Sequence, residues 1–204
     1  MPNIIMADPK GGNPYEFATK LVGATVTEYD DEAVTYVRKY AFAYCASLTS
    51  LKIHNAKTIG DSAFNSCSAL QTIALPKLTA VNGNNQFASC SALVSADFYS
   101  PNAISSYMFS GCTNLSTLVL RKTSVVSLSN TNAFNGTKFK SGGAGGTIYI
   151  PKSLYDHLGD GTADDYKAAS GWSTVNGYGT ITWAKIEGSI YETQYADVTP
   201  IPSA

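Results

Sequence analysis

The sequence predicts an α/β repeat fold: a short solenoid with a parallel concave β-sheet and capped ends. The first observation is a phenylalanine that returns after 22, 23 and 22 residues, at Phe42, Phe64, Phe87 and Phe109. The second is a cysteine three residues after each of these phenylalanines. The third is an alternating apolar ending to each unit, which is typical of a short strand with one buried face. A single coil cannot bury these faces, but stacked coils bury them against one another.

Four units align without gaps, over residues 42–53, 64–75, 87–98 and 109–120. Each reads Phe-x-x-Cys-x-x-Leu and ends in x-x-apolar-x-apolar. The three-residue spacing of the first half predicts one or two helical turns on the wall opposite the strand. A fifth unit starts at Phe134 but is degraded, since it has threonine in the cysteine place and a glycine-rich insertion.

The segment from Ile59 to Pro76 carries the pattern most completely, with Ile59 five residues before Phe64 and a proline after the last leucine. This order resembles the BspA-like, or Treponema pallidum type, class of leucine-rich repeats, over about residues 34–151. The resemblance implies a curved leucine-rich-repeat solenoid. It also implies a non-catalytic role, because members of the class are mostly surface adhesins and similar repeats occur in phage and prophage structural genes.

The regions flanking the repeats are expected to be an arm, caps and a tail. An alternating stretch at 24–29 predicts a strand that closes the first coil. Short helices are expected at 153–158 and 163–169, and Trp172 and Trp183 offer bulk to cover the last coil. We therefore predict four regions: an extended N-terminal arm (1–20), a solenoid with its N-terminal cap (21–151), a C-terminal cap (152–188) and an extended tail (189–204).

Charge gives little indication of a partner. The chain has 14 basic and 15 acidic residues among 204, so neither nucleic acid nor an anionic membrane surface is expected to bind. No export signal is visible at the start, and no apolar run approaches the length that spans a bilayer. Thirteen tyrosines favour contacts through aromatic rings and neutral polar groups.

The four cysteines share one phase of the repeat. A row with one thiol per coil spans about 14 Å at the usual strand spacing, so its sulfurs cannot converge on one zinc ion. An adjacent pair remains a possible disulfide if the side-chain angles permit it. Buried thiols that pack as small apolar groups are the favoured interpretation.

No catalytic site and no cofactor are predicted. His54 and His157 are about a hundred positions apart, and no nucleophile motif accompanies them. The run from Gly142 to Gly146 leads into a strand rather than a helix, which favours a flexible insertion over a phosphate loop. The acidic stretch 160–165 suggests calcium, but helix capping by Thr162 explains the same residues.

The concave strand face is the predicted binding surface, while the convex turns, edges and arms remain alternatives. Tyr99, Arg121 and Tyr149 are the expected anchors, since tyrosine and arginine are enriched in binding hot spots. The predicted binding residues are Lys52, His54, Asp97, Tyr99, Arg121 and Tyr149.

The combined features predict a phage virion protein with a structural or adhesive role, present in many symmetric copies. The sequences around 24–29 and after Ile148 look like the flanks of phage and prophage repeat proteins. The expected partners are other virion proteins, bound through a terminal arm, and a host-surface protein or glycan. The alternative is a bacterial cell-surface adhesin module that binds a host protein or glycan. An enzyme is a third hypothesis, without a convergent acid–base set to support it.

Overall fold

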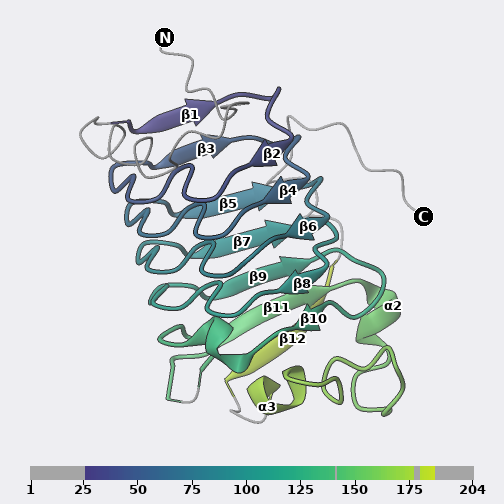
Figure 1. The fold of residues 1–204 in the computed structure, drawn as a ribbon. Helices are drawn as coiled ribbons and strands as arrows, with labels where there is room; N and C mark the ends of the chain where they lie inside the picture. The colour runs from purple at the N-terminus through teal and green to yellow at the C-terminus, as the bar shows by residue number, and fades with distance from the viewer. Residues whose placement is uncertain (1–25, 141, 177–179, 187–204) are drawn as a thin grey trace.

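A computed structural model describes residues 26–140, 142–176 and 180–186 of the chain. In these residues the chain winds into stacked coils joined by parallel strands, with few helices (Figure 1). The predicted class, a short leucine-rich-repeat solenoid with a parallel sheet, is confirmed. The predicted arm at 1–20 and tail at 189–204 lie outside the described residues. None of the described helices is long and apolar enough to cross a membrane.

The main sheet is the predicted strand wall. Five of its strands hydrogen-bond in spatial order: β5 (Thr72–Leu75), β7 (Ser95–Phe98), β9 (Thr117–Leu120), β11 (Gly146–Ile150) and β12 (Ile181–Lys185). At the N-terminal side, β1 (Glu28–Asp30) pairs with β3 (Ser50–Lys52), which confirms the strand expected there. Inward residues stay in register across the sheet, because Ile73 pairs with Ala96 and Ala96 with Leu118.

A second wall is built from two-residue strands that the sequence did not predict. It holds β2 (Tyr36–Val37), β4 (Thr58–Ile59) and β6 (Ala80–Val81) in one sheet, and β8 (Ala103–Ile104) paired with β10 (Ser127–Leu128) in another. The second residue of each strand is buried. Two residues are too few to show the alternation by which a strand is recognised in sequence.

The third wall consists of turns, so the predicted helical turns are wrong. The backbone amides of Tyr40, Phe42 and Tyr44 donate to carbonyls of the next coil, at 3.0, 2.7 and 2.7 Å. An amide used between coils cannot close a hydrogen bond within its own helix. The backbone reaches this arrangement with a positive φ at Tyr40 and Tyr44.

The core is a column of phenylalanines with one ring per coil. Centroids from Phe42 through Phe64, Phe87 and Phe109 to Phe134 are 5.2, 5.1, 5.7 and 6.0 Å apart. Neighbouring rings are nearly parallel, with interplanar angles of 7, 1, 12 and 18°. Each coil therefore depends on the next one for a face of its core.

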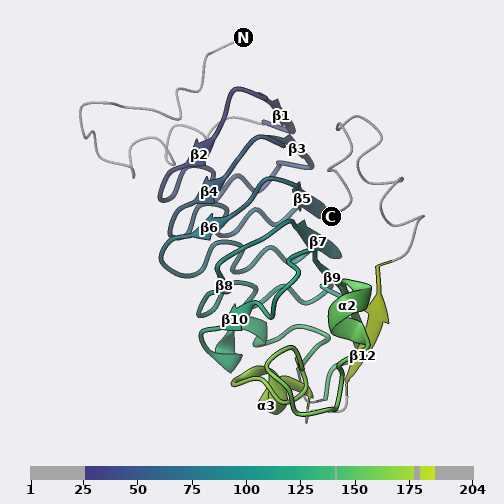
Figure 2. The same ribbon diagram turned by 90° about the vertical axis from the view of Figure 1, so that its right-hand side faces the viewer.

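The C-terminal cap closes the last coil with aromatic side chains. Trp172 lies in α3 (Trp172–Asn176), packs 5.8 Å from Phe134, and donates its indole N–H to the Val126 carbonyl at 2.7 Å. Figure 2 shows α3 at the C-terminal end of the stack. The expected covering by Trp172 and Trp183 is confirmed, since both are buried.

The cap holds less helix than expected. The remaining helical elements are η1 (Thr131–Phe134) and α2 (Lys152–Tyr155). The helix expected at 163–169 is replaced by turns. Thr162 therefore caps no helix, and its side chain donates instead to Asp160 at 2.7 Å.

Candidate binding surfaces

Two of the predicted binding residues are not exposed to solvent. Asp97 and Arg121 have only 1 and 7 % of their surface accessible. Val119 is the register partner of Asp97, and Arg121 lies two residues further on, so both side chains leave the same face of the sheet. Arg121 Nε and Nη2 meet the two carboxylate oxygens of Asp97 at 2.8 and 2.6 Å. The expectation that these two side chains point to solvent is wrong, because they form a buried ion pair with each other.

The other four predicted residues are accessible to different degrees. Lys52 is exposed, whereas Tyr99 and Tyr149 are half-buried. His54 is also half-buried, and its Nδ1 lies 2.6 Å from Oε1 of Glu32. Lys52 and His54 belong to an early coil, and Tyr149 lies on β11, with β5, β7 and β9 between them (Figure 1). The accessible side chains on this face are therefore separate aromatic and polar residues, and the ion pair between Asp97 and Arg121 is buried among them.

The turn wall presents exposed tyrosines that the sequence analysis did not single out. Tyr44 and Tyr107 expose 55 and 42 % of their surface on these turns, and Tyr36 exposes 45 % on the neighbouring strand β2. Tyr44 and Tyr107 have φ values of 64 and 57°. A bulky side chain in this left-handed region is an outlier, because its Cβ crowds the backbone at a cost of about 1–2 kcal/mol.

The repeat shows which residues ordinarily occupy these backbone positions. The place of Tyr107 is held by Tyr40, Ser62 and Asn85 in earlier coils, and that of Tyr44 by Ser66, Ser89 and Gly111 in later coils. All of these residues also have positive φ. The alignment already contained both columns, two residues before and two residues after each phenylalanine, but only the backbone geometry shows that residues in both columns are left-handed.

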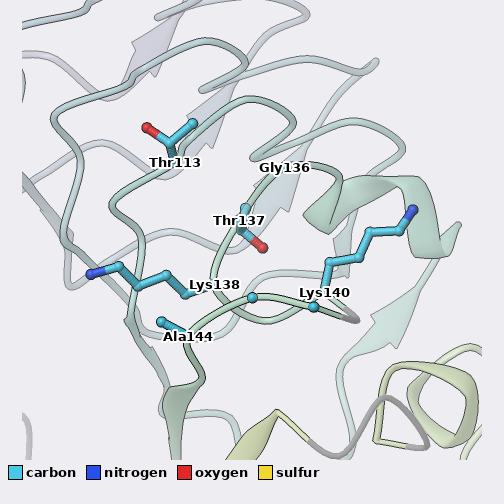
Figure 3. Close-up of a pocket in the computed structure, with 8 residues that line it drawn as sticks. Thr113, Gly136, Thr137, Lys138, Lys140 and Ala144 are labelled. Atoms are coloured by element: carbon cyan, nitrogen blue, oxygen red, sulfur yellow. The ribbon is translucent and has the colours of Figure 1, made fainter.

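The glycine-rich insertion borders a pocket of about 450 Å³ next to Thr113 and Thr137. Its two lysines, Lys138 and Lys140, extend away from each other, so they do not converge on one anion (Figure 3). The Gly143 amide already donates to the Lys140 carbonyl at 2.8 Å. This arrangement lacks the free, convergent amides of a phosphate loop.

The acidic side chains Asp160 and Asp165 accept hydrogen bonds from backbone amides of their own loop. Asp160 accepts from the backbone amide of Thr162 at 2.9 Å, and Asp165 accepts from the amides of Gly161 and Lys167 at 3.1 and 2.8 Å. Within the described residues, no group of three or more histidine, cysteine or acidic side chains is arranged to hold a metal ion.

The four cysteines are buried free thiols, as predicted. Cys67, Cys90 and Cys112 each donate to the carbonyl of the preceding coil's phenylalanine, at 3.0, 3.1 and 3.0 Å. Burial raises the pKa of Cys45 to about 11. The Cys45 thiol therefore remains protonated at neutral pH, and all four buried cysteine side chains serve the core.

The repeats of this chain match a known family of leucine-rich repeats. The model of the BspA type leucine rich repeat region matches residues 31–156 in six copies. The residue pattern alone had indicated five units. A search of curated proteins finds no match.

Two solved structures are similar to the chain. A leucine-rich repeat protein from Eubacterium ventriosum has a TM-score of 0.51 and 25 % identity, over 72 % of this chain and 42 % of that one. A leucine-rich repeat protein from Bacteroides ovatus has a TM-score of 0.37 and 22 % identity, over 63 % of this chain and 44 % of that one. The chain thus matches less than half the length of either protein.

Proposed function

The chain belongs to the BspA-type leucine-rich repeat family, and on that premise we propose that it is a non-catalytic adhesive or structural protein. Its solenoid presents a surface for recognition or decoration. The observation that carries this proposal is the pair of exposed tyrosines, Tyr44 and Tyr107, held in left-handed backbone.

The strain at these tyrosines supports an external contact. Asn85 and Gly111, which tolerate left-handed backbone, occupy the same positions in other coils at lower cost, whereas Tyr40 and the serines bear the same Cβ penalty. The Tyr44 ring is exposed and gains little packing within its own chain, whereas the Tyr107 hydroxyl accepts a hydrogen bond from Asn132 at 3.2 Å, so folding accounts for Tyr44 less than for Tyr107. A binding partner would account for an exposed tyrosine, because a tyrosine ring supplies a large contact area at a small cost in side-chain entropy. Strained residues concentrate at functional positions for the same reason.

A phage virion is the proposed setting. Its support is the likeness of the flanking sequences to those of phage and prophage repeat proteins. Other virion proteins would hold the chain through the terminal arm, and the solenoid would contact a host-surface protein or glycan. Many symmetric copies on one particle would raise the overall affinity of a weak single contact.

A bacterial cell-surface adhesin module is the alternative setting. The similarity to the Eubacterium ventriosum protein supports it, since that neighbour comes from a bacterium. Such a module would use the same tyrosines on a host protein or glycan.

The test begins with the native location of the protein, by gentle fractionation followed by cryo-electron microscopy. Symmetric copies on a virion support the phage setting, and copies on a bacterial envelope support the adhesin. A protein found on neither kind of particle overturns both settings.

Binding to host cells is then compared for the wild type and a Tyr44→Ser, Tyr107→Ser double variant. We expect the variant to fold and to lose adhesion. Val94→Ser is the matched control, because Val94 is also an exposed large side chain but does not have a positive φ. Equal loss in the control and the double variant contradicts a specific role for the tyrosines.

A further inference from the structure

Four side chains on the outward face of the main sheet are buried at its centre. Ser95 and Asp97 on β7, Val119 on β9 and Arg121 just after β9 expose only 8, 1, 1 and 7 % of their surface. We call these four residues the covered patch. Strand pairing screens an outward side chain on its two flanks but not from above. Burial this complete therefore requires chain that lies over the patch.

The described elements do not supply this cover. Among them, β7 and β9 pack against their neighbouring strands, whereas α2 packs against β12 and α3 against η1 (Figure 2). The burial is also local to the patch. Thr72 on β5 and Thr182 on β12 belong to the same row of the sheet as Ser95, and both are exposed. The cover is therefore centred on β7 and β9.

The last strand brings the chain to the edge of this patch. The Ile186 amide donates to the Ile150 carbonyl at 2.9 Å, one residue beyond Tyr149, which pairs with Val119. Ile186 is therefore level with Arg121 and two strands away, about 10 Å. The segment that follows, residues 187–204, lies outside the described residues. At about 3.3 Å per residue, its length exceeds the three strand spacings between β12 and β7 several times over.

We propose that the C-terminal segment, residues 187–204, docks on the covered patch as an internal ligand of the main sheet. The patch suits it, because Val119 offers an apolar contact while Asp97 and Arg121 neutralise each other and leave no net charge. The segment in turn contains no lysine or arginine. Its apolar and aromatic residues are Ile190, Tyr191, Tyr195, Val198 and Ile201.

This docking assigns the centre of the concave face to the chain itself. An external partner then reaches the patch only by displacing the segment. The inference does not depend on the proposed function, since Tyr44 and Tyr107 lie on the turn wall. The competing occupant is the N-terminal segment, residues 1–25. It joins the described chain at Val26, before the first residue of β1, whereas Ile186 follows the last residue of β12, at the end of the strands where Arg121 lies.

A thiol placed in the patch tests the cover. The four native cysteines are buried, so a Val119→Cys variant of the full chain carries one reporter for a soluble maleimide. We expect slow labelling, and a rate at least about tenfold higher when a Gly–Ser segment of equal length replaces residues 187–204. Thr182→Cys is the matched control, because Thr182 is exposed in the same sheet and should react rapidly with either segment.

Rapid labelling of Val119→Cys in the natural chain overturns the proposal. So does slow labelling that persists with the Gly–Ser segment while the urea denaturation midpoint is unchanged. A second measurement keeps the natural segment and places a photoreactive phenylalanine analogue at position 117, on β9 beside the patch. Mass spectrometry should find the crosslink within residues 187–204. A crosslink to residues 1–25 or to a second copy, or none outside the coils, assigns the cover elsewhere and refutes the docking.

Discussion

Arg121 donates two hydrogen bonds to the carboxylate of Asp97, from the residue after β9 to the neighbouring strand β7 of the main sheet. Both side chains are almost completely buried, so the pair joins β7 to the residue that follows β9. Two-point guanidinium–carboxylate pairs are geometrically specific, and this one therefore also reports on the register of the two strands.

Breaking this pair should destabilise the fold. We expect Arg121→Leu or Asp97→Val alone to lower the free energy of unfolding by about 3–5 kcal/mol, because each removes one partner of a buried, two-point ion pair. The double variant should recover most of the loss. Urea denaturation of all four proteins measures the effect, and single variants within about 0.5 kcal/mol of the wild type would contradict it.

The phenylalanine column should dominate stability. Phe64→Ala removes a fully buried ring stacked between Phe42 and Phe87, and should cost about 3–5 kcal/mol. Lys52→Ala, at an exposed position of β3, should stay within about 0.5 kcal/mol. The midpoints and slopes of chemical denaturation distinguish the two, and equal effects would refute the stacked column.

Relief of strain at Tyr44 should not harm the fold. Tyr44→Asn places a residue that tolerates positive φ at a backbone angle of 64°, and should raise the free energy of unfolding by up to about 1 kcal/mol. Tyr29→Asn is the contrasting change, because Tyr29 packs against Phe42 and should lose stability. Calorimetric melting temperatures report both, and a clear loss for Tyr44→Asn would assign its ring a role in folding.

Acid should weaken the C-terminal cap through Asp165. Burial raises the pKa of this carboxyl, but hydrogen bonds from backbone amides, including those of Gly161 and Lys167, outweigh burial and hold the pKa below its ordinary value. A lowered folded-state pKa stabilises the protein above the unfolded value of about 3.9, and this contribution disappears as the pH falls through the folded pKa.

Asp165→Asn should therefore differ from the wild type at pH 6, and the difference should shrink progressively as the pH falls below about 3.9. Asp164→Asn is the matched control, because Asp164 is exposed and the substitution removes the same charge from the same loop. Denaturation curves across this pH range supply the measurement. A constant difference between Asp165→Asn and the wild type would exclude the titration of Asp165 as its cause.

Thiol chemistry should report on the integrity of the coils. Burial raises the pKa of Cys45 to about 11, and contact with the Cys90 thiol, together with burial, raises the pKa of Cys67 and Cys112. Because all four thiols are buried away from the reagent, alkylation at pH 8 should be slow in the native protein and fast in urea. Mass spectrometry of the labelled protein counts the modified cysteines, and rapid native labelling would argue against burial.

The sequence by itself determined the repeat, its register and the identity of the core. Phenylalanine, cysteine and leucine recur at one step, and no arrangement except stacking buries all of them together. Cys67 and Phe64 could therefore be assigned to the core from their phase alone. The covering of the last coil by Trp172 and Trp183 followed from the same reasoning, since an end coil must hide its apolar face.

Only the tertiary structure decided how the walls and surfaces are used. The turns around Phe42 replace helix because their amides bond to the neighbouring coil, and a one-dimensional pattern does not show where an amide points. Asp97 and Arg121 are 24 positions apart in the chain and become partners only through the strand register. The strain at Tyr44 likewise depends on backbone angles, which arise when the coils pack together.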